Sequence, residues 1–331
     1  MIVRLGYVAM STVIENASPS RTMTVANFRK IADREAAVSK LERLASENLH
    51  NTLRLLRHNR THNIRVFRFS SKLIPLFGHE LLQDWDPIAE LEPSFAGIGA
   101  YVREHDMRVS FHPDHFTVMS TPREEVLRAS IADLHRHVRM LEAMGLDESA
   151  KCNIHAGGSY GDIEAAGARF IRQFLALPER IRRRITLEND DKTFNAAQTL
   201  AISEQVGVPM VLDIHHHEVN HAGESAPALW PRIQRTWSEH AGIPNLPPKI
   251  HASSPKDEKN VRSHADYIDT DKFLHFVQAI APMTPRLDVM LEAKMKDGAL
   301  FRLMEELDQA FDVRIVDQAS FEIMGGAGMD A

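Results

Sequence analysis

The sequence predicts a single (β/α)8 TIM barrel, and three observations lead to that fold class. Its 331 residues, 44% of them hydrophobic and 25% charged, suit one large globular domain and exclude a disordered chain. Eight short β-rich runs alternate with longer amphipathic stretches. Runs such as residues 209–212 lack polar alternation, which is typical of parallel strands buried between helices. A doubly wound open sheet is the structural competitor.

The predicted strands follow one another at the spacing that β/α units require. They cover residues 3–8, 64–69, 107–112, 151–155, 185–188, 209–214, 248–252 and 287–293. No linker, internal repeat or low-complexity block separates them. We therefore expect one domain over residues 1–324, followed by a flexible C-terminal tail over residues 325–331.

Candidate helices lie between these strands, and the clearest spans residues 122–144. Thr121 can cap it, Pro122 suits its first position, and Glu124 completes a capping box with Thr121. Five apolar side chains then recur at intervals of three or four residues and form one buried stripe. Further helical patterns cover residues 38–60, 95–105, 163–177, 195–206, 270–281 and 299–310.

Composition narrows the classes of function. One Cys against 18 His excludes an intramolecular disulfide and Cys-rich zinc modules, but leaves abundant imidazole. The 39 basic and 45 acidic residues give a net charge of −6, so bulk charge does not indicate a nucleic-acid binder. No apolar stretch approaches the roughly 18 residues of a membrane span, and the first residues lack a signal-peptide pattern. We expect a cytoplasmic protein with no membrane partner.

Residue types that bind metals end six successive predicted strands. In a parallel barrel these strand ends meet at one rim, where active sites lie. The residues are His112, His155, Glu188, Asp213 with His216 just beyond it, His251 and Glu292, and His264 follows in the loop after the seventh strand. Mixed imidazole and carboxylate ligands suit Mn, Zn or Fe. So many ligands indicate a cluster of two or three divalent ions, the usual apparatus for cutting phosphodiesters.

Lys249 precedes His251 by two residues, so strand alternation points both side chains toward the barrel interior. Burial beside divalent cations would disfavour a charged ammonium. Two interpretations follow. Lys249 is either a structural lysine paired with Glu188 or Glu292, or a neutral amine that adds CO2 and becomes an anionic metal ligand. The chemistry of the residues slightly favours the first.

Nine short motifs follow one another along the chain. They are RLGYV at 4–8, NASPS at 16–20, VFRFSS at 66–71, HPDHF at 112–116, NIHAGG at 153–158, LENDD at 187–191, DIHHH at 213–217, KIH at 249–251 and HADYI at 264–268. In their order and spacing, these motifs resemble the UV damage endonuclease family over nearly the whole chain. The resemblance implies a barrel related to endonuclease IV, a cluster of divalent metals, typically manganese, and incision immediately 5′ to ultraviolet photoproducts.

The resemblance also implies roles for individual residues. Glu188 matches a bridging carboxylate, with Asp213, His251 and Glu292 around one ion, His112 and His155 on a second, and His216 and His264 on a third. Lys249 matches a lysine that the family carries as N6-carboxylysine, which shifts our preference to the second interpretation. Glu188 and Lys249 are the expected catalytic residues, and the expected cofactors are two or three Mn(II) ions, with Zn or Mg as alternatives.

Several residues match or replace family positions that contact DNA. Tyr7, His115 and Phe116 match positions that probe the lesion and the bases opposite it. Some members carry Gln-Tyr in place of His115-Phe116 and an Asn near the position of Ser11, so Ser11 is a further expected contact. Cations for the DNA phosphates are available in residues 54–72, which include six basic and no acidic residues, and in a better placed loop with Lys256, Lys259 and Arg262.

The expected activity is that of a DNA repair endonuclease. It would nick duplex DNA immediately 5′ to cyclobutane pyrimidine dimers and 6-4 photoproducts through attack by a metal-activated water, leaving a 3′-hydroxyl and a 5′-phosphate. The partner would be UV-damaged double-stranded DNA, and we expect a monomer. Two alternatives are a metal-dependent sugar isomerase or epimerase of the same barrel superfamily, and a non-catalytic damage-binding barrel.

Overall fold

A computed structural model describes residues 1–324 and shows eight parallel strands that close into a barrel. The barrel strands are β1 (Ile2–Val8), β2 (Val66–Arg68), β3 (Arg108–Phe111), β4 (Lys151–His155), β5 (Ile185–Glu188), β6 (Met210–Asp213), β7 (Lys249–Ala252) and β8 (Arg286–Leu291). Each strand pairs with the next in sequence, and β1 pairs with both β2 and β8. This closure confirms the predicted TIM barrel and excludes the open sheet.

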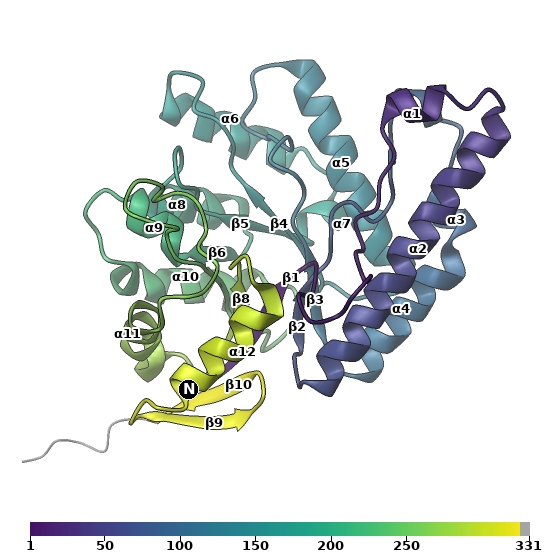
Figure 1. Ribbon diagram of the computed structural model, residues 1–331. Helices are drawn as coiled ribbons and strands as arrows, with labels where there is room; N and C mark the ends of the chain where they lie inside the picture. The colour runs from purple at the N-terminus through teal and green to yellow at the C-terminus, as the bar shows by residue number, and fades with distance from the viewer. Residues whose placement is uncertain (325–331) are drawn as a thin grey trace, which may run out of the picture.

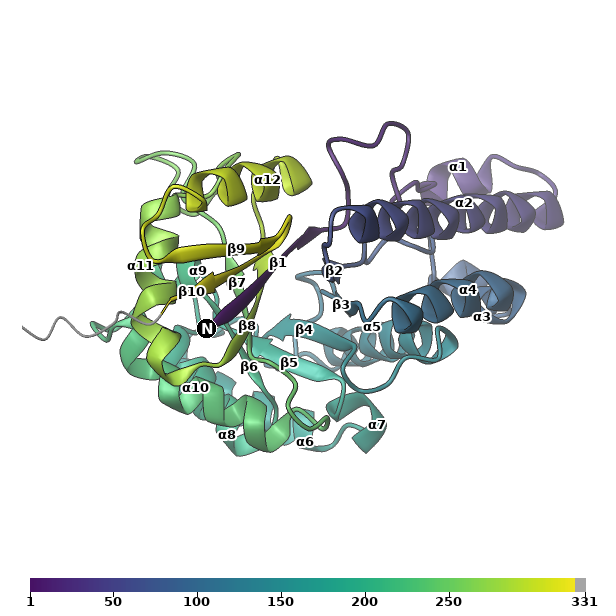
Figure 2. The same ribbon diagram turned by 90° about the horizontal axis from the view of Figure 1, so that it is seen from below.

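Helices surround the strands, as the view from below shows (Figure 2). They are α1 (Val25–Arg29), α2 (Arg34–Thr61), α3 (Pro87–Glu90), α4 (Glu92–Glu104), α5 (Glu124–Ala143), α6 (Ile163–Leu175), α7 (Glu179–Arg182), α8 (Ala196–Val206), α9 (Ile214–Val219), α10 (Ala226–His240), α11 (Thr270–Ile280) and α12 (Lys296–Leu307). Two 3-10 turns, Glu80–Leu82 and Ala281–Met283, complete the set of described helices. None of the helices within residues 1–324 is both long and apolar enough to cross a membrane.

The predicted cap of the fifth helix is wrong. This helix begins at Glu124, and its N-cap is Arg123, which makes no capping hydrogen bond with its side chain. The Thr121 hydroxyl accepts the amide of Arg123 at 3.2 Å instead of capping the helix. Thr121 is fully buried in a turn before the helix, so a local hydrogen bond competes with the capping box that the sequence pattern favours.

A C-terminal hairpin, which the sequence did not predict, pairs with the first half of β1. Its strands are β9 (Val313–Asp317) and β10 (Ser320–Ile323), and β10 pairs antiparallel with the first half of β1 while β2 pairs with the second half. The hairpin lies at the lower end of the barrel beside the N-terminus (Figure 1). The tail expected at residues 325–331 lies outside the described residues.

The close approach of β1 to β2 explains a glycine in the first motif. A Cβ atom added to Gly6 would lie 2.1 Å from the carbonyl oxygen of Val66. Any larger residue would therefore force β1 and β2 apart at the point where they close the barrel. Because β2 has only three residues, the Gly6–Val66 pair is one of the three residue pairs that join β1 to β2.

Candidate metal centre

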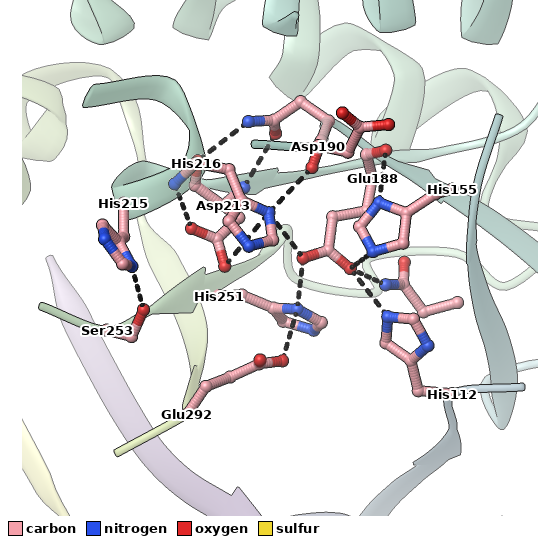
Figure 3. Close-up of polar contacts among 12 residues, drawn as sticks. His112, His155, Glu188, Asp190, Asp213, His215, His216, His251, Ser253 and Glu292 are labelled. Atoms are coloured by element: carbon pink, nitrogen blue, oxygen red, sulfur yellow. Dashed lines mark hydrogen bonds and ion pairs between the residues drawn. The ribbon is translucent and has the colours of Figure 1, made fainter. Parts of the chain in front are cut away.

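Glu188 lies at the centre of a group of imidazoles at the C-terminal rim of the barrel (Figure 3). Its side chain is buried at the end of β5. Oε2 is 3.1 Å from Nε2 of His112 and 3.9 Å from Nε2 of His155. Oε1 is 3.0 Å from Nδ1 of His251 and 3.7 Å from Nδ1 of His216. One carboxylate therefore lies between two pairs of imidazoles, which come from different strands and loops.

Two further carboxylates flank Glu188. Asp213 ends β6 and accepts the backbone amide of His216 at 2.8 Å, so it also caps the short helix α9. Glu292 follows β8, and its Oε1 lies 3.0 Å from Nδ1 of His251. Arg68, at the end of β2, donates a hydrogen bond to the same oxygen of Glu292. The rim therefore gathers carboxylates from β5, β6 and β8.

The donor atoms fit divalent cations. They form three sets whose ligand atoms lie within 4.8 Å of one another: His112, His155 and Glu188; Glu188, Asp213 and His216; and Glu188, His251 and Glu292. Oδ2 of Asp213 and Nε2 of His251 are buried and have no hydrogen-bond partner among the described residues. Such orphaned atoms are costly unless something binds them. The mixture of nitrogen and oxygen donors suits Mn or Zn.

The protonation of these groups shows how strongly they interact. Burial opposes the charged form of Glu188, but His251 and His155 outweigh it and hold the pKa of this carboxyl well below its usual range. Burial raises the pKa of Asp213. Burial also works against a charged His216, yet Asp213 and Glu188 raise the pKa of this imidazole to about 9. Burial likewise opposes a charged His251, whose pKa Glu188 and Glu292 raise, whereas burial lowers the pKa of His112; a divalent ion would replace the protons that the carboxylates favour on His216 and His251.

Backbone carbonyls orient most of the rim histidines. The Nδ1 atoms contact carbonyl oxygens as follows: His112 contacts Pro113 at 3.0 Å, His155 contacts Glu188 at 3.3 Å, His216 contacts Asn189 at 3.0 Å, and His264 contacts Glu292 at 2.7 Å. A contact of this kind fixes the ring and makes Nδ1 the protonated nitrogen. The other ring nitrogen, Nε2, is then left as the lone-pair donor.

The family resemblance implies that Asp213 lies with His251 and Glu292 around one ion. In the structure the donor atoms of Asp213 lie within 4.8 Å of those of His216 and Glu188, and His251 and Glu292 form a set with Glu188. His264 belongs to none of the three sets, although its Nδ1 lies 3.9 Å from Oε2 of Glu292. The reason is that α9 turns His216 back over the end of β6, toward the aspartate that caps it.

Lys249 is buried in the barrel interior, and its ammonium donates to the hydroxyl of Ser110 at 3.2 Å. It makes no ion pair with any described residue, so the predicted pairing with Glu188 or Glu292 is wrong. Burial, together with the nearby Arg108 guanidinium, lowers the pKa of Lys249 to about 7. The charged form of this lysine is therefore poorly stabilised where it stands.

Arg68 and Asn153 contact the rim carboxylates, and the sequence reading gave neither of them this role. Arg68 was grouped with cations for DNA phosphates, but its guanidinium is mostly buried and binds Glu292. Asn153 donates to Oε2 of Glu188 and accepts from the hydroxyl of Thr186 at 2.8 Å. Asn153 lies two residues before a rim histidine on β4, so strand alternation was a signal that could have found it.

The expectation that Tyr7 inserts into DNA is contradicted. Its side chain is fully buried, and its hydroxyl donates to Oδ1 of Asn59 on α2 at 2.7 Å. Its ring also packs edge-on against Phe67 with centroids 5.2 Å apart, so the Tyr7 side chain lies between the strands and α2. Ser11 lies nearer the rim, where its hydroxyl donates to Asp297 and accepts the amides of Val13 and Ile14.

His115 and Phe116 lie on the rim loop after β3, as exposed side chains. Phe116 is 73% exposed, and the two rings lie with centroids 4.0 Å apart. Nδ1 of His115 also lies 2.6 Å from Oδ1 of Asp114. The pair is therefore an accessible aromatic projection.

A pocket of about 500 Å³ lies between this loop and the rim histidines. Its walls include Pro113, Thr117, Gly157, Gly158, Asp190 and Arg262, with His112, His155, His216 and His264 on the metal side. The basic loop residues Lys256, Lys259 and Arg262 are exposed, and Arg262 lies 3.7 Å from Asp191. An extended ligand could thus reach the cluster through a pocket whose lining includes Arg262 of this basic loop.

Comparisons with known proteins agree with the motifs. Residues 3–322 match the model of the family described as UV-endonuclease UvdE. The chain is 42% identical to the UV DNA damage endonuclease of Halalkalibacterium halodurans over 97% of its own length and 99% of that protein's. It is 37% identical to the UV DNA damage endonuclease of Bacillus cereus, over 97% and 100% of the two chains.

Solved structures show the same architecture. The crystal structure of SacUVDE superposes with a TM-score of 0.80 at 31% identity, covering 93% of this chain and 98% of that one. Endonuclease IV from Thermus thermophilus shares the fold, with a TM-score of 0.52 at 13% identity over 93% and 100% of the two chains. The match over nearly the full length, together with the barrel and its rim of histidines and carboxylates, shows that the chain belongs to the UV-endonuclease UvdE family.

Proposed function

We propose that this protein is a metal-dependent DNA endonuclease that nicks duplex DNA immediately 5′ to ultraviolet photoproducts and leaves a 3′-hydroxyl and a 5′-phosphate. One observation carries the proposal: three sets of nitrogen and oxygen donors share the single buried carboxylate of Glu188. Sets that share one carboxylate bring ions close together, as phosphodiester cleavage by paired ions requires.

Glu188 is the proposed bridge between the ions. His112 and His155 would hold one side, His216 and Asp213 a second, and His251 and Glu292 a third, with His264 completing a shell from the loop after β7. When bound, the divalent ions, most readily Mn(II), activate water and stabilise the departing 3′ oxygen. Arg68 keeps Glu292 in place, and Asn153 does the same for Glu188.

Lysine carboxylation is the proposed state of Lys249. A neutral amine attacks CO2, the N–C bond forms, and one amine proton is released to solvent, which leaves an anionic carbamate. The lowered pKa of Lys249, near 7, supplies the neutral amine, and its nitrogen is held by a hydrogen bond to the hydroxyl of Ser110 and by no ion pair among the described residues. The product would turn a poorly placed cation into an oxygen donor beside His251.

Damage recognition would occur at the pocket beside the cluster. Photoproducts stack and pair poorly, so extruding them from a duplex costs less than extruding normal bases. Phe116 and His115 would insert into the duplex while the lesion enters the pocket of about 500 Å³. Lys256, Lys259 and Arg262 would contact the phosphates at its edge.

Family membership favours this function over a sugar isomerase, because the relatives over the full length of the chain are endonucleases. A non-catalytic sensor is disfavoured because each proposed metal-binding residue is present. The remaining proposals are a single functional domain over residues 1–324, a monomer, and a cytoplasmic location on chromosomal DNA.

The test is incision of a duplex with one defined cyclobutane dimer. Protein stripped of metal by chelation should leave the strand intact, and added Mn(II) should restore a single nick at the 5′ side of the dimer. The 5′-end-labelled product should be extendable by a polymerase, which reports a 3′-hydroxyl. An intact strand with Mn(II) present, or nicking that ignores the lesion, would overturn the proposal.

A further inference from the structure

Phe116 and Tyr160 are exposed aromatic side chains on neighbouring rim loops, and only Phe116 has a role in the function proposed above. Phe116 follows β3, and Tyr160 follows β4 and is 44% exposed. Within residues 1–324 the other strongly exposed aromatic side chain is Phe311, which lies before the C-terminal hairpin, away from the rim. We propose that Tyr160 stacks against a base that flanks the lesion, so that the duplex is held by aromatic rings on both rim loops. This inference rests on the function proposed above.

The backbone at Tyr160 is held in an unusual conformation. Its φ is +52°, a left-handed value that is rare for a bulky residue. The flanking loop contains Gly157 and Gly161, with φ values of +110° and +87°. Strain of this kind costs about 1–3 kcal/mol and tends to persist at binding sites, where the surrounding structure enforces it. The loop therefore presents the ring outward at a cost in stability.

The ring is supported from one side. The guanidinium of Arg169, on α6, lies over the Tyr160 ring at 5.6 Å from its centroid. Arg169 is itself fixed, because its Nε donates to the carbonyl of Ser120 at 2.9 Å. Arg169 covers one part of the ring and 44% of the side chain stays exposed, and an exposed aromatic ring is a surface on which a nucleobase stacks.

The two aromatic loops are joined by a hydrogen bond and by close packing. The hydroxyl of Ser120, in the loop of Phe116, donates to the carbonyl of Gly158 at 2.9 Å, in the loop of Tyr160. A Cβ on Gly157 would lie 2.5 Å from Cγ1 of Val118, so the loops pack without a gap. Because Arg169 binds the same Ser120, the positions of both rings depend on each other.

The ring also lies beside the proposed lesion pocket. Gly158 lines that pocket, and a Cβ placed on it would lie 3.3 Å from Cε2 of Tyr160. The tyrosine is not among the residues that line the pocket, so its ring would receive a base next to the lesion. Phe116 and Tyr160, on neighbouring rim loops, would thus both engage the duplex beside the pocket.

The test measures binding of a duplex with one cyclobutane dimer to wild type, Tyr160→Leu and Tyr160→Phe, with undamaged duplex as reference. Loss of one stacked base should weaken binding of Tyr160→Leu about tenfold, while Tyr160→Phe, which keeps the ring, should stay within about twofold of wild type. Phe311→Leu is the matched control, since it removes an exposed ring far from the rim. 2-Aminopurine next to the dimer should be less quenched with Tyr160→Leu.

Photocrosslinking tests the same contact with wild-type protein alone. 5-Iododeoxyuridine placed on either flank of the dimer should crosslink wild-type protein at the peptide that contains Tyr160, and the reactive flank identifies the stacked base. Affinity of Tyr160→Leu within twofold of wild type, unchanged 2-aminopurine emission, or crosslinks confined to other peptides would each overturn the inference. If wild type fails to prefer or nick the damaged duplex, the proposed function fails instead.

Discussion

At the N-terminal end of the barrel interior, Asp288 lies between Arg4 and Arg108; at the C-terminal end, Glu188 lies among four histidines. Both carboxylates are buried. Asp288 receives two hydrogen bonds from Arg4, at 2.7 and 2.8 Å, and one from Arg108 at 2.7 Å. The carboxylate is therefore fully neutralised by fixed cations from β1 and β3.

The rim differs because Glu188 and Asp213 face histidines and no fixed cation among the described residues, although Glu292 is paired with Arg68. Its histidines carry charge only when protonated, and Asp213 and His251 keep buried atoms without hydrogen bonds among residues 1–324. Nη2 of Arg108 at the lower end is also buried without a hydrogen bond among the described residues, so the two ends differ in their carboxylates: fixed guanidinium groups pair both oxygens of Asp288, whereas Oδ2 of Asp213 has no partner. We therefore interpret the Asp288 cluster as structural and the Glu188 cluster as functional. Substitutions at each end of the barrel test this difference.

The largest expected effect is on catalysis at the rim. Glu188→Gln removes the carboxylate that all three donor sets share, so the single-turnover rate of incision beside a cyclobutane dimer should fall about 1000-fold or more. The free energy of unfolding of the metal-free variant, measured by urea denaturation, should differ from that of wild type by much less than the activation free energy does. Near-normal incision by this variant at saturating Mn(II) would show that Glu188 is not the bridge.

The complementary change at the lower end should affect folding. Asp288→Asn leaves Arg4 and Arg108 buried with weaker compensation, so the free energy of unfolding should fall by about 3–5 kcal/mol. Equilibrium urea denaturation measures this change. The Mn(II) bound per folded molecule, measured by elemental analysis, should match wild type; a lost metal would mean that the two ends are not independent.

Stabilisation of the protein by a divalent metal should depend on the rim carboxylates and not on Asp288. Mn(II) at about 100 times its dissociation constant should add about 2.7 kcal/mol to the free energy of unfolding of wild type, seen as a rise in Tm. Asp288→Asn should show the same rise, and Glu188→Gln a much smaller one. Equal rises in all three proteins would indicate that the ions bind elsewhere.

The smallest expected effect is on stability in acid. Burial opposes ionisation of Asp288, but Arg108 and Arg4 outweigh it and lower the pKa of this carboxyl below its usual value of 3.8. A lowered folded-state pKa stabilises the protein above the unfolded value, and this contribution is lost as the pH falls through the folded one. The stability difference between wild type and Asp288→Asn should therefore shrink below about pH 4. A constant difference down to pH 2 in urea titrations would contradict it.

Strand positions and rim residues could be predicted because they depend on local pattern and one topological rule. His155 and Glu188 end their strands as expected, and parallel strands in a closed barrel bring such ends together. The C-terminal hairpin and α10 were missed, since the hairpin is short and Pro231 lies inside that helix. Local pattern gives no strong signal in either place.

The amino-acid sequence by itself determined the barrel, the family and the residue types that gather at its rim, because period, spacing and motif order are properties of the chain. Tertiary structure alone decided that Tyr7 turns toward Asn59 and that Arg68 binds Glu292, a partner 224 residues away. It also decided that Tyr160 stands exposed over Arg169. These contacts depend on side-chain direction and on packing between distant elements, which no local periodicity encodes.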